Sequence, residues 1–263
     1  MSSLAFRLAC TVTAALLLCV GCTVDVISET TTPILAYEIV KTYPHDRGAF
    51  TQGLDYVDGF FYEGTGIYGH STLRKVDPAT GTSTQRINLP SHHFGEGIVV
   101  AGDRIIQLTW QTEAGFVYDK DSFALENTFS YKHEGWGITF DGTHLIVSDG
   151  SWRLRFWDPQ TFEETAVIEV KDGNRPIQNL NELEYVNGSV FANVWKTDAI
   201  CRIDPKTGQV TGWIDLKGIL TQDDLAQPVD VLNGIAYNDS ADTFFITGKL
   251  WPKVFEIRLA PES

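Results

Sequence analysis

Positive charge is scarce in this sequence. It has 20 Lys and Arg against 34 Asp and Glu, which gives a formal net charge of −14. Nucleic acids and anionic lipid surfaces are bound through clustered Lys and Arg, so the composition argues against both as partners. With 43% apolar residues the chain is neither disordered nor fibrous. Its 263 residues are enough for one large folded domain or two small ones.

Cysteine is also rare. Three of the four cysteines, Cys10, Cys19 and Cys22, lie in the first 22 residues, so the body of the chain contains only Cys201. No disulfide can therefore form within the body. Cys201 lies in the alternating segment AICRID, which is typical of a strand. We expect a buried thiol that packs in the core rather than a nucleophile.

The N-terminus contains an uncharged apolar run. Arg7 precedes it, and residues 8–20 are too few to span a bilayer comfortably, as in a secretory signal. The pair Gly21-Cys22 that closes the run resembles the lipobox of bacterial lipoproteins, with Cys19 in the position where Leu is usual. A plain signal peptide or an uncleaved anchor is the alternative.

This pattern predicts the domain organisation and the location. We expect a lipoprotein-type signal peptide at 1–21, a tether at 22–36 and one folded domain at 37–263. Cys22 is the expected lipidation site. The protein is then exported and held at the membrane of the cell envelope, on the periplasmic side.

A repeat dominates the rest of the chain. Each copy begins with a similar segment and continues with three further strand-like runs, separated by turn signals such as Asp-Pro and Thr-Gly. Four short strands in about 40 residues are the pattern of a propeller blade. The aligned apolar residues of the five copies are Leu54, Ile98, Ile138, Leu183 and Ile235.

The two ends of the chain complete this pattern. The fifth copy ends near Leu259 and has room for only three strands, whereas residues 36–44 form a surplus strand before the first copy. We predict an all-β, five-bladed β-propeller with four-stranded antiparallel blades. The N-terminal strand completes the last blade and removes an exposed sheet edge. A solenoid is the alternative, and the missing terminal strand argues against it.

The first strand of each blade lines the channel of a propeller, so equivalent positions form rings around one axis. One such set precedes the repeat glycine and contains Gln52, Glu96, Trp136, Asn181 and Asn233. A second set lies near the end of the second strand and contains Thr65, Trp110, Gly150, Trp195 and Lys249. In both sets the residue type differs from blade to blade, whereas a purely structural ring would tend to repeat the same residue. They predict a small-molecule pocket with aromatic walls and a few polar groups.

Five motifs in order carry a resemblance to a known family. FTQGL, FGEG with a following LTW, EGWG, LNELEYVNG with NVW, and TGKLWP resemble the plant and bacterial glutaminyl-peptide cyclotransferases, which are five-bladed propellers. The likeness covers residues 37–259. It implies an acyltransferase that converts the N-terminal Gln of peptides or proteins into pyroglutamate and releases ammonia. The animal enzymes with this activity are zinc α/β proteins and are not similar to this chain.

The resemblance also implies the site residues. Glu96 is the implied catalytic residue, and the implied substrate-binding residues are Phe50, Gln52, Phe94, Trp110, Trp136, Asn181, Trp195 and Lys249. The reaction needs a neutral α-amine, which titrates near ~8, and a protonated leaving nitrogen. Glu96 is the only carboxylate in the inner set, so we assign it the role of proton shuttle. An aromatic pocket raises the pKa of such a carboxyl group.

Other functions have less support. Residues 37–263 contain no HExxH or CxxC motif, so we expect catalysis without a metal or another cofactor, while a structural ion in the channel stays open. A non-catalytic propeller that binds peptides or proteins of the cell envelope is the main alternative. Propeller lactonases and sugar dehydrogenases need a metal or a quinone. We expect a monomer whose longest insertion, residues 217–231, lies near the site.

Overall fold

The computed structural model describes residues 32–261. The predicted signal peptide, the lipidation site Cys22 and most of the predicted tether lie outside the described residues. Within residues 32–261 no helix is long and apolar enough to cross a membrane.

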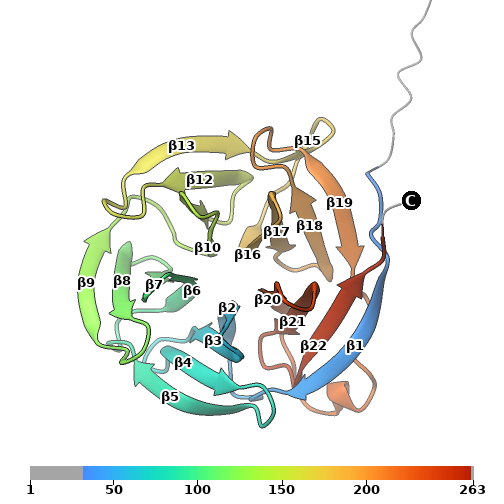
Figure 1. Ribbon diagram of the computed structural model, residues 1–263, viewed down its shortest axis with the longest axis horizontal. Coiled ribbons are helices and arrows are strands. Elements are labelled where there is room, and N and C mark those ends of the chain that lie inside the picture. The colour runs from blue at the N-terminus through green and yellow to red at the C-terminus, as the bar shows by residue number, and fades with distance from the viewer. Residues whose placement is uncertain (1–31, 262–263) are drawn as a thin grey trace, which may run out of the picture. The chain divides into compact units, whose positions relative to one another are not determined.

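Five four-stranded antiparallel sheets surround a central axis (Figure 1). Blade 1 contains β2 (Thr51–Val57), β3 (Phe60–Thr65), β4 (Thr72–Asp77) and β5 (Thr82–Asn88). Blade 2 contains β6 (Gly95–Ala101), β7 (Arg104–Thr109), β8 (Ala114–Asp119) and β9 (Leu125–Ser130). Blade 3 contains β10 (Ile138–Phe140), β11 (Leu145–Ser148), β12 (Arg153–Trp157) and β13 (Glu164–Glu169). Blade 4 contains β16 (Leu180–Val186), β17 (Ser189–Val194), β18 (Ala199–Ile203) and β19 (Val210–Asp215).

Blade 5 joins the two ends of the chain. It contains β20 (Leu232–Asn238), β21 (Thr243–Gly248), β22 (Lys253–Leu259) and, as its outermost strand, β1 (Tyr37–Pro44). Figure 1 shows β1 in blue beside β22 in red. The innermost strands pack against one another around the axis, so the ring is closed. The predicted five-bladed propeller with its N-terminal closing strand is confirmed, and a solenoid is excluded.

The core lies between the blades. Each of five clusters of buried apolar side chains joins two neighbouring sheets. Between blades 1 and 2, Tyr62 and Leu73 pack against Ile98 and Ile105. Full burial of one such side chain stabilises by about 1.5–3 kcal/mol, so these clusters hold the ring together. Cys201 is fully buried between blades 3 and 4, as predicted.

Asp residues end the third strands, where the sequence predicts turns. Each accepts a hydrogen bond from a backbone N–H two or three residues further on. These turn residues are Asp77, Asp119, Asp158 and Asp204.

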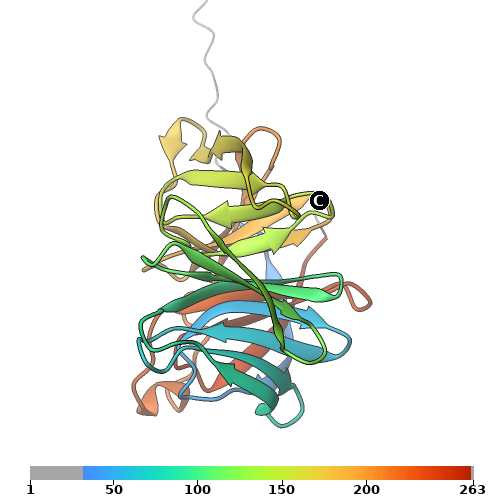
Figure 2. The same ribbon diagram turned by 90° about the vertical axis from the view of Figure 1, so that its left-hand side faces the viewer.

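Three small features add to the repeat. A hairpin of β14 (Lys171–Asp172) and β15 (Arg175–Pro176) follows blade 3. The 3-10 helix η1 (Asp224–Ala226) lies in the insertion before blade 5 and is the orange coil at one face of the ring in Figure 2. Residues 33–35, in the segment assigned to the tether, pair with β19 at Trp213. Buried Leu35 covers β19 there, so this outer strand is less exposed than those of the other blades.

Candidate active site

Four of the five innermost strands contain a β-bulge at the same repeat position. The register shifts enclose Gln52 in β2, Glu96 in β6, Asn181 in β16 and Asn233 in β20. A bulge places an extra residue on one strand and turns its side chain away from the regular alternation. In blade 3 the strand β10 is short, and Trp136 precedes it at the equivalent position. The bulges thus direct polar side chains toward the axis.

Glycines beside these residues let the innermost strands approach one another. A Cβ atom on Gly53 would lie 2.3 Å from the backbone nitrogen of Ile98. One on Gly137 would lie 2.1 Å from the carbonyl oxygen of Asn181. The Gln-Gly, Glu-Gly and Trp-Gly pairs of the repeat therefore have a steric cause: only glycine fits where two strands meet.

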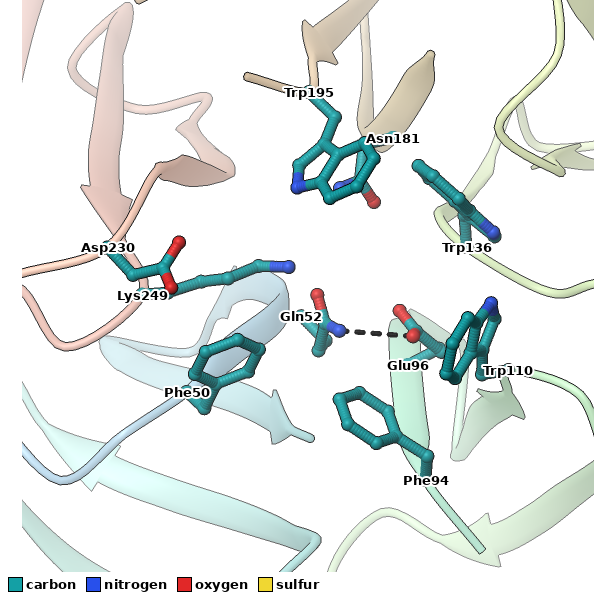
Figure 3. A pocket seen from close by; sticks show the side chains of 10 residues that line it. All are labelled: Phe50, Gln52, Phe94, Glu96, Trp110, Trp136, Asn181, Trp195, Asp230 and Lys249. Atoms are coloured by element: carbon teal, nitrogen blue, oxygen red, sulfur yellow. Dashed lines mark hydrogen bonds between the residues drawn. The ribbon is translucent and has the colours of Figure 1, made fainter. Parts of the chain in front are cut away.

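One pocket of about 240 Å³ collects all nine predicted site residues. Three of the residues, Trp110, Trp195 and Lys249, follow the second strands β7, β17 and β21. Figure 3 shows the set around the cavity; its members are Phe50, Gln52, Phe94, Glu96, Trp110, Trp136, Asn181, Trp195, Lys249 and one residue not predicted, Asp230.

The carboxyl group of Glu96 is buried, with 5% of the residue exposed. Its Oε1 accepts a hydrogen bond of 3.0 Å from Nε2 of Gln52. Burial raises the pKa of Glu96 well above its ordinary value; the charge of Lys249 lowers it and that of Glu134 raises it further. A carboxyl group with a raised pKa is a better proton donor than an ordinary one, which suits a group that accepts and then returns a proton.

Lys249 supplies the positive charge of the pocket and is also only 5% exposed. Its Nζ lies 4.8 Å from the ring centroid of Phe50, within cation–π range. Burial lowers the pKa of Lys249, against the opposing charges of Glu96 and Asp230. Burial therefore opposes the charged form of both Glu96 and Lys249, while the attraction between the two groups favours it.

Asp230 is the lining residue that the repeat did not reveal. It lies in the 217–231 insertion, and the equivalent positions of blades 1 to 3 are Ala49, His93 and His133, so the repeat does not indicate a carboxylate here. Its backbone N–H donates to the carbonyl of Lys249 at 2.9 Å, which brings the insertion to the pocket. The position immediately before the fifth repeat was the only signal for it in the sequence.

Aromatic side chains form most of the wall. Phe50 meets Phe94 at 6.2 Å and Phe94 meets Trp110 at 5.7 Å between ring centroids. Trp136 meets Trp195 at 5.4 Å with perpendicular rings. These are edge-to-face contacts, which fix the rings in place and keep water from the carboxyl group.

Three members of the predicted rings do not line the pocket. Asn233 is fully buried, and its Nδ2 donates to the carbonyl of Thr51 at 3.0 Å. Thr65 bonds Thr72 through their hydroxyl groups. Gly150 faces the back of Trp136, because a Cβ atom there would lie 2.6 Å from the indole. Their roles are structural.

The pocket carries no metal-binding pattern. Across residues 32–261 no group of three or more His, Cys, Asp or Glu side chains is arranged to hold a metal ion. The pocket instead contains two carboxyl groups, one amino group and two amides, which can bind an amide-bearing substrate and move a proton on it.

Comparisons with known proteins agree with this geometry. A profile of the glutamine cyclotransferase family matches residues 11–259. The chain is 42% identical over 232 residues to a glutaminyl-peptide cyclotransferase of Arabidopsis thaliana, which covers 86% of this chain and 72% of the plant protein. The crystal structure of Myxococcus xanthus glutaminyl cyclase is similar with a TM-score of 0.81 at 36% identity, covering 88% of this chain and 100% of that one. This chain therefore belongs to the glutamine cyclotransferase family.

Proposed function

We propose that the pocket cyclises the N-terminal Gln of peptides or proteins to pyroglutamate and releases ammonia, with Glu96 as the proton shuttle. The observation that carries the proposal is a buried carboxyl group, hydrogen-bonded to an amide, in an aromatic cavity of about 240 Å³. The family and the name of the Arabidopsis relative support the activity.

One group, the carboxyl group of Glu96, can carry out both proton transfers that the reaction needs. The α-amine nitrogen of the substrate attacks its own γ-carboxamide carbon, and a C–N bond forms as the ring closes. The amine proton passes to the Glu96 carboxylate. Glu96 then gives that proton to the carboxamide nitrogen, whose bond to carbon breaks, and ammonia leaves. The acyl group has moved from one nitrogen to another, so the reaction is an acyl transfer.

Three polar side chains beside Glu96 can assist the reaction, each in a different way. Asn181 has a buried Oδ1 without a hydrogen-bond partner among the described residues, so it is free to accept from the amine or the carboxamide. Gln52 holds Glu96 in place. Lys249 lies where its charge can stabilise the oxyanion that develops on the attacked carbonyl. The tryptophans exclude water and hold the substrate side chain folded toward ring closure.

A peptide assay tests the proposal. The purified protein is incubated with a short peptide that begins with Gln, in the presence of EDTA, and mass spectrometry follows the loss of one ammonia. We expect loss well above the spontaneous rate, and a decrease in turnover of about 10²–10⁴-fold for Glu96→Gln with a smaller change in KM. An N-acetylated peptide, whose amine cannot attack, is the control.

Three other outcomes would each contradict one part of the proposal. Wild-type turnover in Glu96→Gln would remove the shuttle role. Loss of activity with EDTA alone would show that the enzyme needs a metal. No cyclisation of several Gln peptides would favour the non-catalytic, peptide-binding propeller.

We also propose that the protein is exported and lipidated at Cys22. The proposal is supported by the sequence of residues 1–22 alone. Expression in a bacterial host and fractionation tests it: the wild-type protein is expected in the membrane fraction, and Cys22→Ser in the soluble envelope fraction. Equal distribution of the two would contradict the lipid anchor.

A further inference from the structure

Glu134 lies behind the pocket, in the connection between β9 and β10, and does not line the cavity. Its Oε2 accepts two hydrogen bonds, from Nε1 of Trp110 at 2.8 Å and from Nε1 of Trp136 at 2.9 Å. Its Oε1 accepts a third from Nε2 of Gln111 at 3.1 Å. An ionised carboxylate has room for about four donors, and such charge-assisted bonds are the strong ones.

These bonds use the single N–H donor of each indole. In Figure 3 the nitrogens of Trp110 and Trp136 face one another on the side of the pocket away from Lys249. The two tryptophans come from blades 2 and 3, and each also contacts another aromatic wall residue, Phe94 or Trp195. Glu134 therefore joins two separate aromatic pairs into one wall across a blade boundary.

The repeat makes this arrangement specific to blade 3. Glu134 occupies the position at which blades 1 and 2 have the pocket-lining Phe50 and Phe94. A carboxylate at this place has no counterpart in those blades. The propeller fold does not require a carboxylate at this position. The hydrogen bonds to two indoles do give it a role there.

Glu134 also acts on Glu96 by charge. Hydrogen bonds from Trp136, Gln111 and Trp110 lower the pKa of Glu134 against the effect of burial and of Asp149, so it is ionised at neutral pH. Its negative charge raises the pKa of Glu96. The other ionisable side chains of the pocket are Lys249, which has the opposite effect on Glu96, and Asp230. Tyr131, a phenol that is neutral at this pH, also interacts with Glu96.

We propose that Glu134 is a positioning residue of the proposed cyclisation, which fixes Trp110 and Trp136 as walls and keeps a fixed negative charge behind Glu96. This inference rests on the proposed function for its kinetic consequences. The orientation of the indoles and the ionisation of Glu96 can be measured without turnover.

Two variants separate the hydrogen bonds of Glu134 to the indoles from the effect of its charge on Glu96. Glu134→Gln keeps an oxygen that can accept from the indoles but removes the charge. We expect its KM for a Gln peptide within about threefold of wild type, and the ionisation of Glu96 displaced to lower pH. Glu134→Ala removes both the accepting oxygen and the charge. We expect it to raise the KM about tenfold and to change the near-ultraviolet circular dichroism of the indoles.

Two readouts need no activity. Tryptophan fluorescence of the free enzyme is titrated from pH 4 to 9, and the step that is absent from Glu96→Gln is assigned to Glu96. Near-ultraviolet circular dichroism reports the order of the indoles. Glu126→Gln, an exposed carboxylate on the outer strand β9, is the matched control and is expected to match wild type throughout.

The outcomes are distinct. A Glu96 step at the wild-type pH in Glu134→Gln, or a wild-type spectrum and KM in Glu134→Ala, would overturn the inference. If the wild-type protein cyclises no peptide, the proposed function fails, and the titration and the spectra still decide the role of Glu134. If Glu134→Ala does not fold, the titration of Glu134→Gln decides.

Discussion

Asn181 combines two properties. It lines the pocket, and its Oδ1 is a buried acceptor without a partner among the described residues. A buried polar group left without a hydrogen bond costs about 1–3 kcal/mol. Because this oxygen belongs to a residue that lines the pocket, a bound ligand can supply the missing donor.

We therefore expect Asn181→Leu to raise the KM for a Gln peptide by about tenfold and to raise the free energy of unfolding by about 1 kcal/mol. Steady-state kinetics and urea unfolding measure the two. Asn193→Leu is the matched control: Oδ1 of Asn193 accepts from the backbone of Gly234 at 2.9 Å, so this change is expected to destabilise by about 1–3 kcal/mol. A less stable Asn181→Leu with unchanged KM would show that the amide is structural.

At the scale of elements, β1 closes the ring, and a buried ion pair secures its end. His45 follows β1, and its Nε2 lies 2.9 Å from Oε1 of Glu63 in blade 1, while its Nδ1 contacts the carbonyl of Trp251 in blade 5. Burial alone would lower the pKa of His45, but Glu63 outweighs it and the pKa is raised. The same pair lowers the pKa of Glu63 against its burial.

The pH dependence of this pair follows from the two shifts. The raised pKa of His45 gives stability that is full below about pH 6.5 and is lost as the pH rises through the folded value. The lowered pKa of Glu63 gives stability that is full above about pH 4.3 and is lost as the pH falls through its folded value. The pair thus contributes most between these limits.

We expect Glu63→Gln to lower the free energy of unfolding by about 3 kcal/mol near pH 5.5, and by less as the pH rises and His45 loses its proton. Urea unfolding at several pH values measures this. Glu38→Gln, which breaks the exposed Glu38–Arg258 pair of the same β1–β22 junction, is the control, with an expected change below about 1 kcal/mol. A deficit in Glu63→Gln that is independent of pH would contradict the role of the charge on His45.

The whole ring depends on contacts across the axis, and Glu182 provides two of them. It stands in blade 4 where blades 1 to 3 have the repeat glycine, and it is 1% exposed. Its carboxyl group accepts from the backbone of Leu54 in blade 1 at 3.2 Å and of Ile235 in blade 5 at 2.8 Å. Burial raises the pKa of Glu182 well above its ordinary value, against these two bonds.

A raised carboxyl pKa means that the folded protein keeps a proton which the unfolded chain releases above about pH 4.3. The contribution of Glu182 to stability is then greatest at acidic pH and falls as the pH rises toward its folded pKa. Glu182→Gln has no such titration, so we expect its stability relative to wild type to improve from pH 4.5 to pH 8. Urea unfolding at both values, with exposed Glu126→Gln as the control, measures it; a constant difference would contradict the prediction.

The repeat in the sequence predicted the five-bladed architecture and most of the residues that line the pocket. The repeat determined both because each blade is built from local strand and turn signals, and because equivalent positions of a closed ring must meet at one axis. The nine site residues came together for that reason, with the resemblance to the family adding Phe50 and Phe94.

The contacts between repeats and behind the pocket are visible only in the folded ring. The bulges at Gln52 and Glu96 depend on how two strands pair, and no single strand encodes that register. Asp230 reaches the site through an insertion without a repeat partner, and Glu134 through contacts between two blades. These are contacts between segments distant in sequence, so their geometry exists only once the ring is closed.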